Sequence, residues 1–328
     1  MLKNLIINTL GCGPIPALLQ KKLKRNGVSI LAYHGVIDRP LAFDDWCFLS
    51  TEAFEEQVAY LSQHFKIVHL SDAVQALENG PVDEPLAVIT FDDGYRNNLT
   101  KALPILKKYN APATIYLVTN QVATDETLWF CRLNHAIEQT LAQQLTWNGK
   151  HYTLGSAIEK SQASASIQQS LKGMHNDRLL EAVNDIAKTL DVDISQEVAQ
   201  DSAHRLLSAD EMQTLLDSGL ITFGAHTHDH TILARLSEAE QKQQIALSKA
   251  GVEAITGEPC EHFAYPNGGH HDYDPTTAKL LKEAGFKSCV TMLTGNNIDL
   301  TYPYHLNRYG IGSDTAFSRF KLWVHNIR

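Results

Sequence analysis

The sequence lacks the charge and the long apolar run that would place it in two large functional classes. Its 28 lysines and arginines are outnumbered by 37 aspartates and glutamates, which gives a formal net charge of −9. No strong basic field is therefore available to hold nucleic acid or a polyanionic polymer, and neutral or cationic partners fit better. No apolar stretch approaches the ~20 residues of a transmembrane helix, so we expect no membrane span.

Cysteine is also scarce, and the N-terminus lacks a secretion signal. The five cysteines are odd in number and form no Cys-x-x-Cys pair, so neither a disulfide framework nor a cysteine zinc site is indicated. Glycines and prolines at 11–16 interrupt the apolar N-terminal stretch, unlike the core of a signal peptide. We therefore expect a cytoplasmic protein. The lysines and arginine at 21–25 leave a peripheral membrane contact as an alternative to a plain packed helix.

Strand and helix patterns alternate along most of the chain. Apolar runs at 28–36, 86–91 and 113–118 read as buried strands, and helical periodicity separates them. The alternation resumes with a strand at 220–225. Such alternation predicts a parallel sheet or barrel. A chain of 328 residues exceeds one average domain but fits a single α/β barrel that carries an insertion.

The regular alternation is interrupted between about 122 and 204. A helix beginning at Trp129, a hairpin with an Asn-Gly turn at 148–149 and polar helical sequence occupy this stretch. We therefore predict an N-terminal helical segment at 1–27 and a barrel at 28–328 with a mostly helical insertion at about 122–204. The insertion is expected either to wall the substrate groove or to mediate assembly.

Two carboxylates, Asp92 and Asp93, directly follow one of the buried strands. Successive strand side chains point to opposite faces, so the two can share a site only where the strand gives way to a turn. Gly94 permits that turn. An Asp-Asp-Gly sequence is also common in surface turns, so the pair indicates a site only if another segment joins it.

A histidine cluster at the exit of a later strand is the candidate for that second segment. His226, His228 and His230 fall within five residues, and the outer two are four apart. Their imidazoles converge if the segment turns helically, as metal-binding histidine pairs do. Two imidazoles and one carboxylate leave an open coordination position, which is typical of catalytic metal sites. A second carboxylate within reach can then take a proton from a metal-activated water.

A third strand end carries Phe-Ala-Tyr-Pro at 263–266, and strand ends form the active face of a parallel barrel. With these three segments, the chain resembles the polysaccharide deacetylases, carbohydrate esterase family four. The matching motifs are Asp-Asp at 92–93, His-Thr-x-x-His at 226–230 and Phe-Ala-Tyr-Pro at 263–266. The similarity extends in order and spacing from about Ile30 to Ile311.

The resemblance implies a distorted (β/α) barrel of seven or eight strands and a metal-dependent hydrolase. It implies that Asp92 is the base, and that the metal ligands are Asp93, His226 and His230. It also suggests that the backbone amide of Asn267 helps to hold the oxyanion. The expected reaction removes acetyl groups from N-acetylhexosamine units of a glycan or glycan precursor, by attack of metal-bound water. Zinc is the default metal, and cobalt or nickel would suit the same ligands.

Two departures from the family pattern leave parts of the mechanism open. Many members have arginine where this chain has Ala264, so another group must orient Asp92. The late Leu-x-His motif, which supplies the general acid, is not clearly present. His305 is our first candidate for that acid and His34 the second, and Arg308 is an alternative partner for a carboxylate. We assign substrate contacts to Tyr95, Tyr265, Pro266, His34 and Arg308.

Two other functions are compatible with the same residues. An O-acetyl esterase or a non-sugar amide hydrolase would use the same metal site on another substrate, because one fold hosts many substrates. A catalytically silent barrel that binds glycans is the alternative from a different class.

Overall fold

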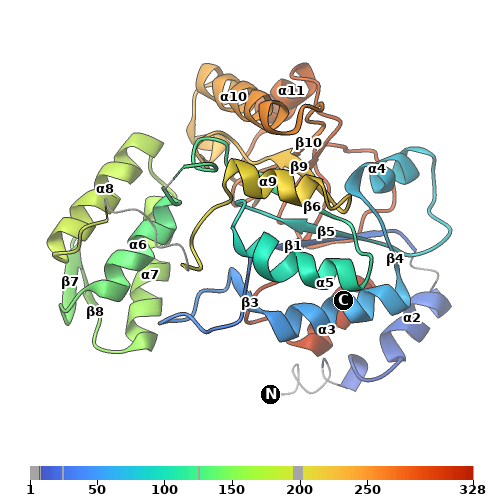
Figure 1. Cartoon of the computed structure of the whole chain (residues 1–328), viewed down its shortest axis with the longest axis horizontal. Coiled ribbons are helices and arrows are strands. Elements are labelled where there is room, and N and C mark those ends of the chain that lie inside the picture. Colours follow the sequence, from blue (N-terminus) through green and yellow to red (C-terminus); the bar gives the residue numbers. More distant parts are fainter. Residues whose placement is uncertain (1–6, 8, 24–25, 125, 195–201, 328) are drawn as a thin grey trace.

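A parallel sheet forms the centre of the molecule, flanked by helices (Figure 1). The computed structural model describes residues 7, 9–23, 26–124, 126–194 and 202–327. Within them the eight-stranded sheet has the order β11-β10-β9-β6-β5-β1-β12, and β4 pairs with β5 off this path. The strands are β1 (Val28–Tyr33), β4 (Lys66–Ile67), β5 (Leu86–Phe91), β6 (Ala113–Leu117), β9 (Ile221–Ala225), β10 (His262–Ala264), β11 (Ser288–Val290) and β12 (Tyr309–Gly310). A separate short pair joins β2 (Gly35–Ile37) to β3 (Phe48–Ser50).

Helices connect these strands and cover the sheet (Figure 1). They are α2 (Ile15–Leu23), α3 (Thr51–His64), α4 (Leu70–Glu78), the π-helix η1 (Asn98–Ala102), α5 (Leu103–Lys108), α9 (Ala209–Leu216), the 3₁₀ helix η2 (Leu233–Arg235), α10 (Glu238–Thr256), α11 (Pro275–Glu283) and α12 (Phe317–Val324). Local sequence explains the bounds of α10, the longest of these. Ser237 and Glu240 form a capping box at its start, and Gly257 ends it with a left-handed φ of 69°.

The sheet curls until a single stretch of chain touches both of its edges. Leu306 forms a parallel bridge with Val290 at the end of β11. Three residues later Tyr309 pairs with Leu31 of β1. The stretch 306–310, which we call the closing segment and which contains β12, therefore joins β11 to β1. The prediction of a distorted (β/α) barrel is confirmed.

Side-chain alternation along β5 separates the barrel interior from the layer under the helices. Ile89 and Phe91 pack in the large core cluster together with residues of α3. Val88 packs instead in a second cluster with Ile30 and Tyr116 from the neighbouring strands. Because strand side chains alternate, Thr90 and Asp92 lie on the same face of the strand as Val88, two and four residues further along. Asp92 thus faces the interior at the carboxyl end of the barrel.

A mostly helical unit lies between β6 and α9, to one side of the sheet (Figure 1). Its elements are α6 (Trp129–Gln139), β7 (Gln144–Trp147), β8 (Lys150–Thr153), α7 (Ala157–Leu171) and α8 (Asn176–Thr189). The β7–β8 turn has left-handed φ angles at Asn148 and Gly149, as an Asn-Gly turn requires. The helical insertion is confirmed, whereas its limits of 122–204 and the division into 1–27 and 28–328 stay predictions.

Two aspects of the N-terminal prediction have different outcomes. The helix α2 lies within 1–27, but residues 1–6, 8 and 24–25 fall outside the described part, including two members of the basic cluster. Over the residues that are described, no helix combines the length and apolar character needed to cross a membrane.

Candidate active site

The paired aspartates lie where β5 ends and the backbone turns. Asp93 and Gly94 both have a φ of 76°, in the left-handed region that residues other than glycine rarely adopt. The alternation of the strand stops at this turn, so Asp93 is not forced to the face opposite Asp92. Both carboxylates are almost completely buried. An energetically unfavourable backbone angle at a buried acid is typical of functional sites.

Asp93 meets two histidines from the loop that follows β9, two strands away from β5 in the sheet. Its Oδ1 lies 3.7 Å from Nε2 of His226 and 3.3 Å from Nε2 of His230. All three residues are buried, and their ligand atoms lie within 4.8 Å of one another. The two imidazoles meet edge to face, with ring centroids 5.0 Å apart. One oxygen and two nitrogens therefore converge on a common point.

The hydrogen bonding of His226 fixes which of its nitrogens can bind a cation. Its Nδ1 lies 2.7 Å from the carbonyl oxygen of Ala264, which can only accept a hydrogen bond. Nδ1 must therefore carry the proton, and the lone pair is on Nε2, the nitrogen that faces Asp93. Burial lowers the pKa of His226 to about 4, so the imidazole is neutral at physiological pH. A neutral imidazole is the form that binds metals.

The donor set fits a divalent cation. Asp93 Oδ1 and His230 Nδ1 are buried and lack a hydrogen-bond partner among the described residues. An unpaired buried carboxylate oxygen costs free energy unless another group satisfies it. Asp93, His226 and His230 could satisfy that demand by holding a metal, and an aspartate with two histidines suits zinc and related ions.

The loop after β9 brings the two histidines together by a route other than the helical turn we expected. Thr227 and His230 have left-handed φ angles of 62° and 55°. Gln244 of α10 accepts hydrogen bonds from the backbone N–H groups of His228 and Asp229 at 3.0 Å each, which fixes the loop. The expectation of a helical turn was wrong, because two left-handed residues reverse the chain within the same four-residue spacing.

Arg308 in the closing segment binds Asp92 through a two-pronged contact. Its Nη1 and Nη2 donate to Oδ1 and Oδ2 of Asp92, each at 2.7 Å. Its Nε donates to the carbonyl of Thr291 at 2.9 Å. The guanidinium is completely buried, so its assignment to substrate contact was wrong, and the alternative of a carboxylate partner is correct. Arg308 thus provides the cation that is missing at Ala264.

This contact decides the charge of Asp92. Burial alone would raise the pKa of this carboxyl, but the adjacent Arg308 guanidinium outweighs burial and holds the pKa well below its usual range. Asp92 is therefore ionised, and its plane is fixed by two parallel hydrogen bonds.

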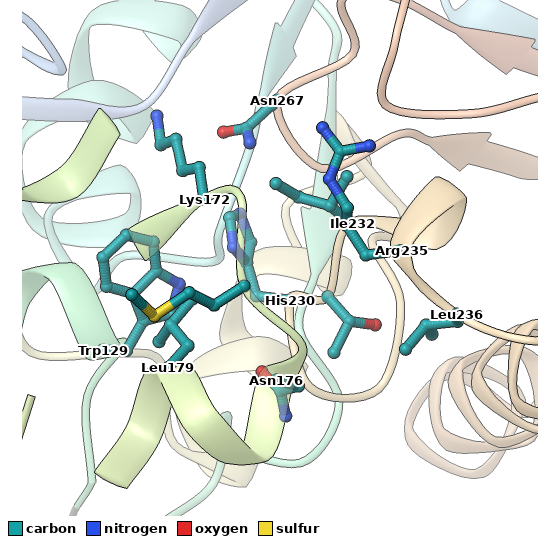
Figure 2. Close-up of a pocket in the computed structure, with 11 residues that line it drawn as sticks. Trp129, Lys172, Asn176, Leu179, His230, Ile232, Arg235, Leu236 and Asn267 are labelled. Carbon is teal, nitrogen blue, oxygen red and sulfur yellow. The ribbon is translucent and has the colours of Figure 1, made fainter. Parts of the chain in front are cut away.

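Asn267 presents a free backbone donor next to the same site. It has a left-handed φ of 59°, and its backbone N–H makes no hydrogen bond to any described residue. Asn267 and His230 line one pocket (Figure 2). An N–H at this position could stabilise an oxyanion that develops in the pocket.

Three residues that we assigned to substrate contact are instead structural. Tyr95 is fully buried, with its hydroxyl 3.3 Å from Sγ of Cys131. Tyr265 is also fully buried and donates to the carbonyl of Tyr304 at 3.1 Å. Pro266 follows it and is buried as well. These assignments were wrong, because all three side chains are buried in the protein, although Tyr95 lies near enough to Asp93 to interact with its charge.

The two candidates for the general acid are placed very differently. His305 is exposed, and its Nδ1 lies 3.2 Å from the hydroxyl of Tyr273. Among the described residues, no hydrogen bond or salt bridge joins His305 to Asp92 or Asp93, so its catalytic role stays a prediction. His34 is half-buried at the exit of β1, close enough to act electrostatically on both Asp92 and Asp93.

His34 has an aromatic neighbour that sequence reasoning missed. The ring of Trp46 meets it edge to face at 5.1 Å and is 45% exposed. The Nδ1 of His34 has no hydrogen-bond partner among the described residues. Trp46 lies in an irregular loop before β3, where no periodic pattern could have marked it.

The insertion forms one wall of the pocket that opens on His230 (Figure 2). Trp129, Lys172 and Leu179 come from this unit, whereas Ile232 and Arg235 come from the loop after β9. Of the two roles expected for the insertion, this placement favours the wall of a substrate groove. Sequence reasoning named none of these residues as part of a site.

The curled parallel sheet and the cluster of acids and imidazoles at its carboxyl end define a (β/α)-barrel protein with a candidate metal centre. The family model for polysaccharide deacetylase matches residues 79–289, and the chain belongs to this family.

Named relatives match only part of the chain. The poly-beta-1,6-N-acetyl-D-glucosamine N-deacetylase of Escherichia coli (strain K12) is 33% identical over 100 residues, which are 29% of this chain and 14% of that protein. The enzyme of the same name from Staphylococcus epidermidis is 30% identical over 118 residues, 32% of this chain and 41% of that protein. The chain thus matches less than half the length of either relative.

Solved structures extend the similarity of fold to almost the whole chain. The structure of IcaB from Ammonifex degensii has a TM-score of 0.59 at 20% identity and covers 92% of this chain and 97% of its own. The Streptococcus pyogenes deacetylase PplD in complex with acetate has a TM-score of 0.60 at 18% identity, with coverages of 91% and 98%. At these identities the comparison shows the shared fold.

Proposed function

We propose that this protein is a metal-dependent hydrolase that removes acetyl groups from N-acetylhexosamine units of a glycan or glycan precursor. The observation that carries the proposal is the buried cluster of Asp93, His226 and His230 beside an aspartate held ionised by Arg308. Membership of the polysaccharide deacetylase family and the names of the two partial relatives support the N-acetylated substrate.

The proposed roles follow from the position of each group. Asp93, His226 and His230 hold a divalent metal, which when bound lowers the pKa of water to about 7 and polarises the acetyl carbonyl. Asp92 accepts the proton of the attacking water, because its carboxylate is ionised and Arg308 holds it in place. The backbone N–H of Asn267 donates to the developing oxyanion. His34 delivers a proton to the leaving nitrogen, since it lies near both aspartates and, unlike His226 and His230, does not belong to the proposed metal-binding cluster.

A panel of substrates tests the reaction class. Metal-loaded protein is incubated with N-acetylglucosamine oligomers, O-acetylated xylan and a simple acetamide, and released acetate is measured alongside bound metal. We expect release from the N-acetylated oligomers. Release from the xylan or the acetamide alone would favour an O-acetyl esterase or a non-sugar amide hydrolase. Glycan binding without any release would favour a silent binding barrel.

The metal itself is proposed to be zinc, with cobalt or nickel as alternatives. The donor set of one carboxylate and two imidazoles supports each of these ions. Chelation followed by reloading with each ion tests this choice. The metal that restores the highest acetate release at its stoichiometric occupancy is the functional one.

We further propose a cytoplasmic location with a peripheral membrane contact through α2. Leu18 and Leu23 are exposed on this helix, and Lys21 and Lys22 lie in its last turn. Exposed leucines beside lysines suit the surface of an anionic bilayer. Cell fractionation tests the location. Co-sedimentation with anionic vesicles tests the contact, and binding that persists in a Leu18→Ser, Leu23→Ser variant would contradict it.

A further inference from the structure

The pocket beside His230 is lined by two cationic side chains, and neither forms a salt bridge with a described carboxylate. Lys172 follows α7 and Arg235 ends η2, and both line the pocket. None of the described residues that line it is acidic. Neither side chain forms a salt bridge with a described residue, and Arg235 donates only to the neutral carbonyl of His271 at 3.3 Å.

This local charge contrasts with the net charge of −9 on the whole chain. Lysine is rarely removed from solvent without an anionic partner, yet Lys172 is half-buried. With more acidic than basic residues in the sequence, a pocket with two cations and no acid is not expected from composition. The arrangement therefore suggests that the ligand supplies the anionic group that pairs with these two cations.

The cationic groups lie close to the candidate reaction centre. In Figure 2 the Lys172 ammonium and the Arg235 guanidinium flank the side chain of Asn267, and the Trp129 ring and Leu179 form the opposite side. The pocket begins at His230, a member of the metal-binding cluster. A group bound between the two cations would thus belong to the sugar being processed or to its immediate neighbour.

We propose that this pocket binds an anionic group, a carboxylate or a phosphate, that the glycan carries next to the acetamido group. The inference rests on the proposed N-deacetylation, because it assigns the substrate class of the same site. Guanidinium and ammonium groups form their strongest hydrogen bonds with anionic oxygens. Lys172 is partly buried, which weakens screening of its charge by water and salt, whereas Arg235 is exposed. The substrate is accordingly an acidic N-acetylated glycan, although the protein as a whole is acidic.

The test compares three N-acetylglucosamine oligosaccharides of equal length. One is neutral, one alternates with glucuronate, and one carries a phosphate monoester. Acetate release by the metal-loaded full chain is measured as kcat/KM for each. We expect a preference for at least one acidic substrate that declines as salt is added. The arm that shows the preference identifies carboxylate or phosphate.

Variants connect that preference to the pocket. A Lys172→Met, Arg235→Met double variant should lower the ratio of kcat/KM for the acidic over the neutral substrate at least about tenfold. Lys172→Arg should retain most of the ratio because it keeps the charge. Lys107→Met is the matched control, since Lys107 is exposed on α5 and its side chain contacts no described partner, and its ratio should equal that of the wild type.

The outcomes separate the two proposals. A wild type that prefers the neutral oligomer, or a double variant with an unchanged ratio, overturns the pocket inference while acetate release still supports the proposed function. Absence of release from every substrate overturns the proposed function. In that case, calorimetry measures the binding of the same oligosaccharides. The inference is overturned if the wild type binds acidic and neutral oligosaccharides with equal affinity. It is also overturned if the double variant binds the acidic ones as tightly as the wild type.

Discussion

The carboxyl end of the barrel and the insertion that faces it build their parts of the site in different ways. In the barrel, Asp92, Asp93 and His226 directly follow strands and are buried. In the insertion, Lys172 follows a helix and is half-buried. The sheet register fixes the first group, whereas the second belongs to a unit outside the sheet. We therefore propose that the barrel sets the chemistry and that the insertion selects the glycan that reaches it.

The largest expected effect concerns the barrel side of this comparison. Asp92→Asn should lower acetate release about 1000-fold, because an amide cannot accept the proton of the attacking water. Bound metal should stay at the wild-type level, since Asp93, His226 and His230 are retained. Acetate release and metal content are measured on the same preparation. Asp83→Asn, at an exposed aspartate, is the control. Wild-type activity in the Asp92 variant would refute its role as base.

A second comparison asks which imidazole supplies the proton. His34→Gln should lower kcat about 100-fold, because the leaving nitrogen then departs without a proton donor. His305→Gln should leave kcat within about twofold of wild type, since His305 is exposed and contacts Tyr273 rather than either aspartate. Acetate release is followed for both variants under saturating substrate. The reverse order of effects would return His305 to the mechanism.

Arg308 tests whether orientation of the base matters separately from its presence. Arg308→Lys should lower kcat about tenfold to 100-fold with little change in KM, because a lysine keeps the charge but loses the two-pronged contact. A purely structural role would instead lower the amount of folded protein without changing kcat per folded molecule. Active-site titration combined with steady-state kinetics separates these cases. Arg308→Met should destabilise the fold by about 3–5 kcal/mol, since it leaves Asp92 buried and unpaired.

The last predicted effect is on stability and lies outside the site, with no change in the catalytic rate. Burial lowers the pKa of His262 and of His325 to about 4 from the ordinary 6.5. Above pH 6.5 both are neutral in the folded and unfolded chains. As the pH falls from 6.5 to 4 the unfolded chain takes up protons first, so the free energy of unfolding decreases, by up to about 3 kcal/mol for each histidine.

Urea unfolding at pH 7 and pH 4.5 measures this decrease. His325→Gln should make the free energy of unfolding less dependent on pH, because it removes one of the histidines whose pKa burial lowers. His135→Gln, at an exposed histidine, should leave the dependence as in the wild type. An unfolding free energy in the wild type that does not change between these pH values would contradict the shifted pKa values.

The barrel and its acid and imidazole cluster could be predicted because their signals are local. Runs of apolar residues predict the buried strands, and Asp92, Asp93 and His226 directly follow those strands in the chain. The left-handed residues that reverse the loop before His230 could not be predicted, because threonine and histidine carry no signal for that conformation.

Residues whose roles depend on distant contacts could not be assigned with the same clarity. Arg308 contacts a carboxylate 216 positions away, so its partner emerges only once the barrel has closed. Trp46 lies in a loop, and Lys172 directly follows a helix. Tryptophans and lysines at such positions often have no role in binding, so nothing in the sequence distinguishes these two. The pocket was therefore absent from the predictions, although every strand end that borders it was present.

The closing segment links the assembly of the molecule to its activity. Leu306 touches β11, Tyr309 pairs with β1, and Arg308 lies between them with its guanidinium on Asp92. Asp92 therefore acquires its partner only when the closing segment has joined β11 to β1. A partly folded chain, even with β5 and β9 already paired to β6, would have the metal ligands but an unoriented base. Such an intermediate would have no hydrolytic activity. The onset of activity during refolding would therefore report when the closing segment completes the barrel.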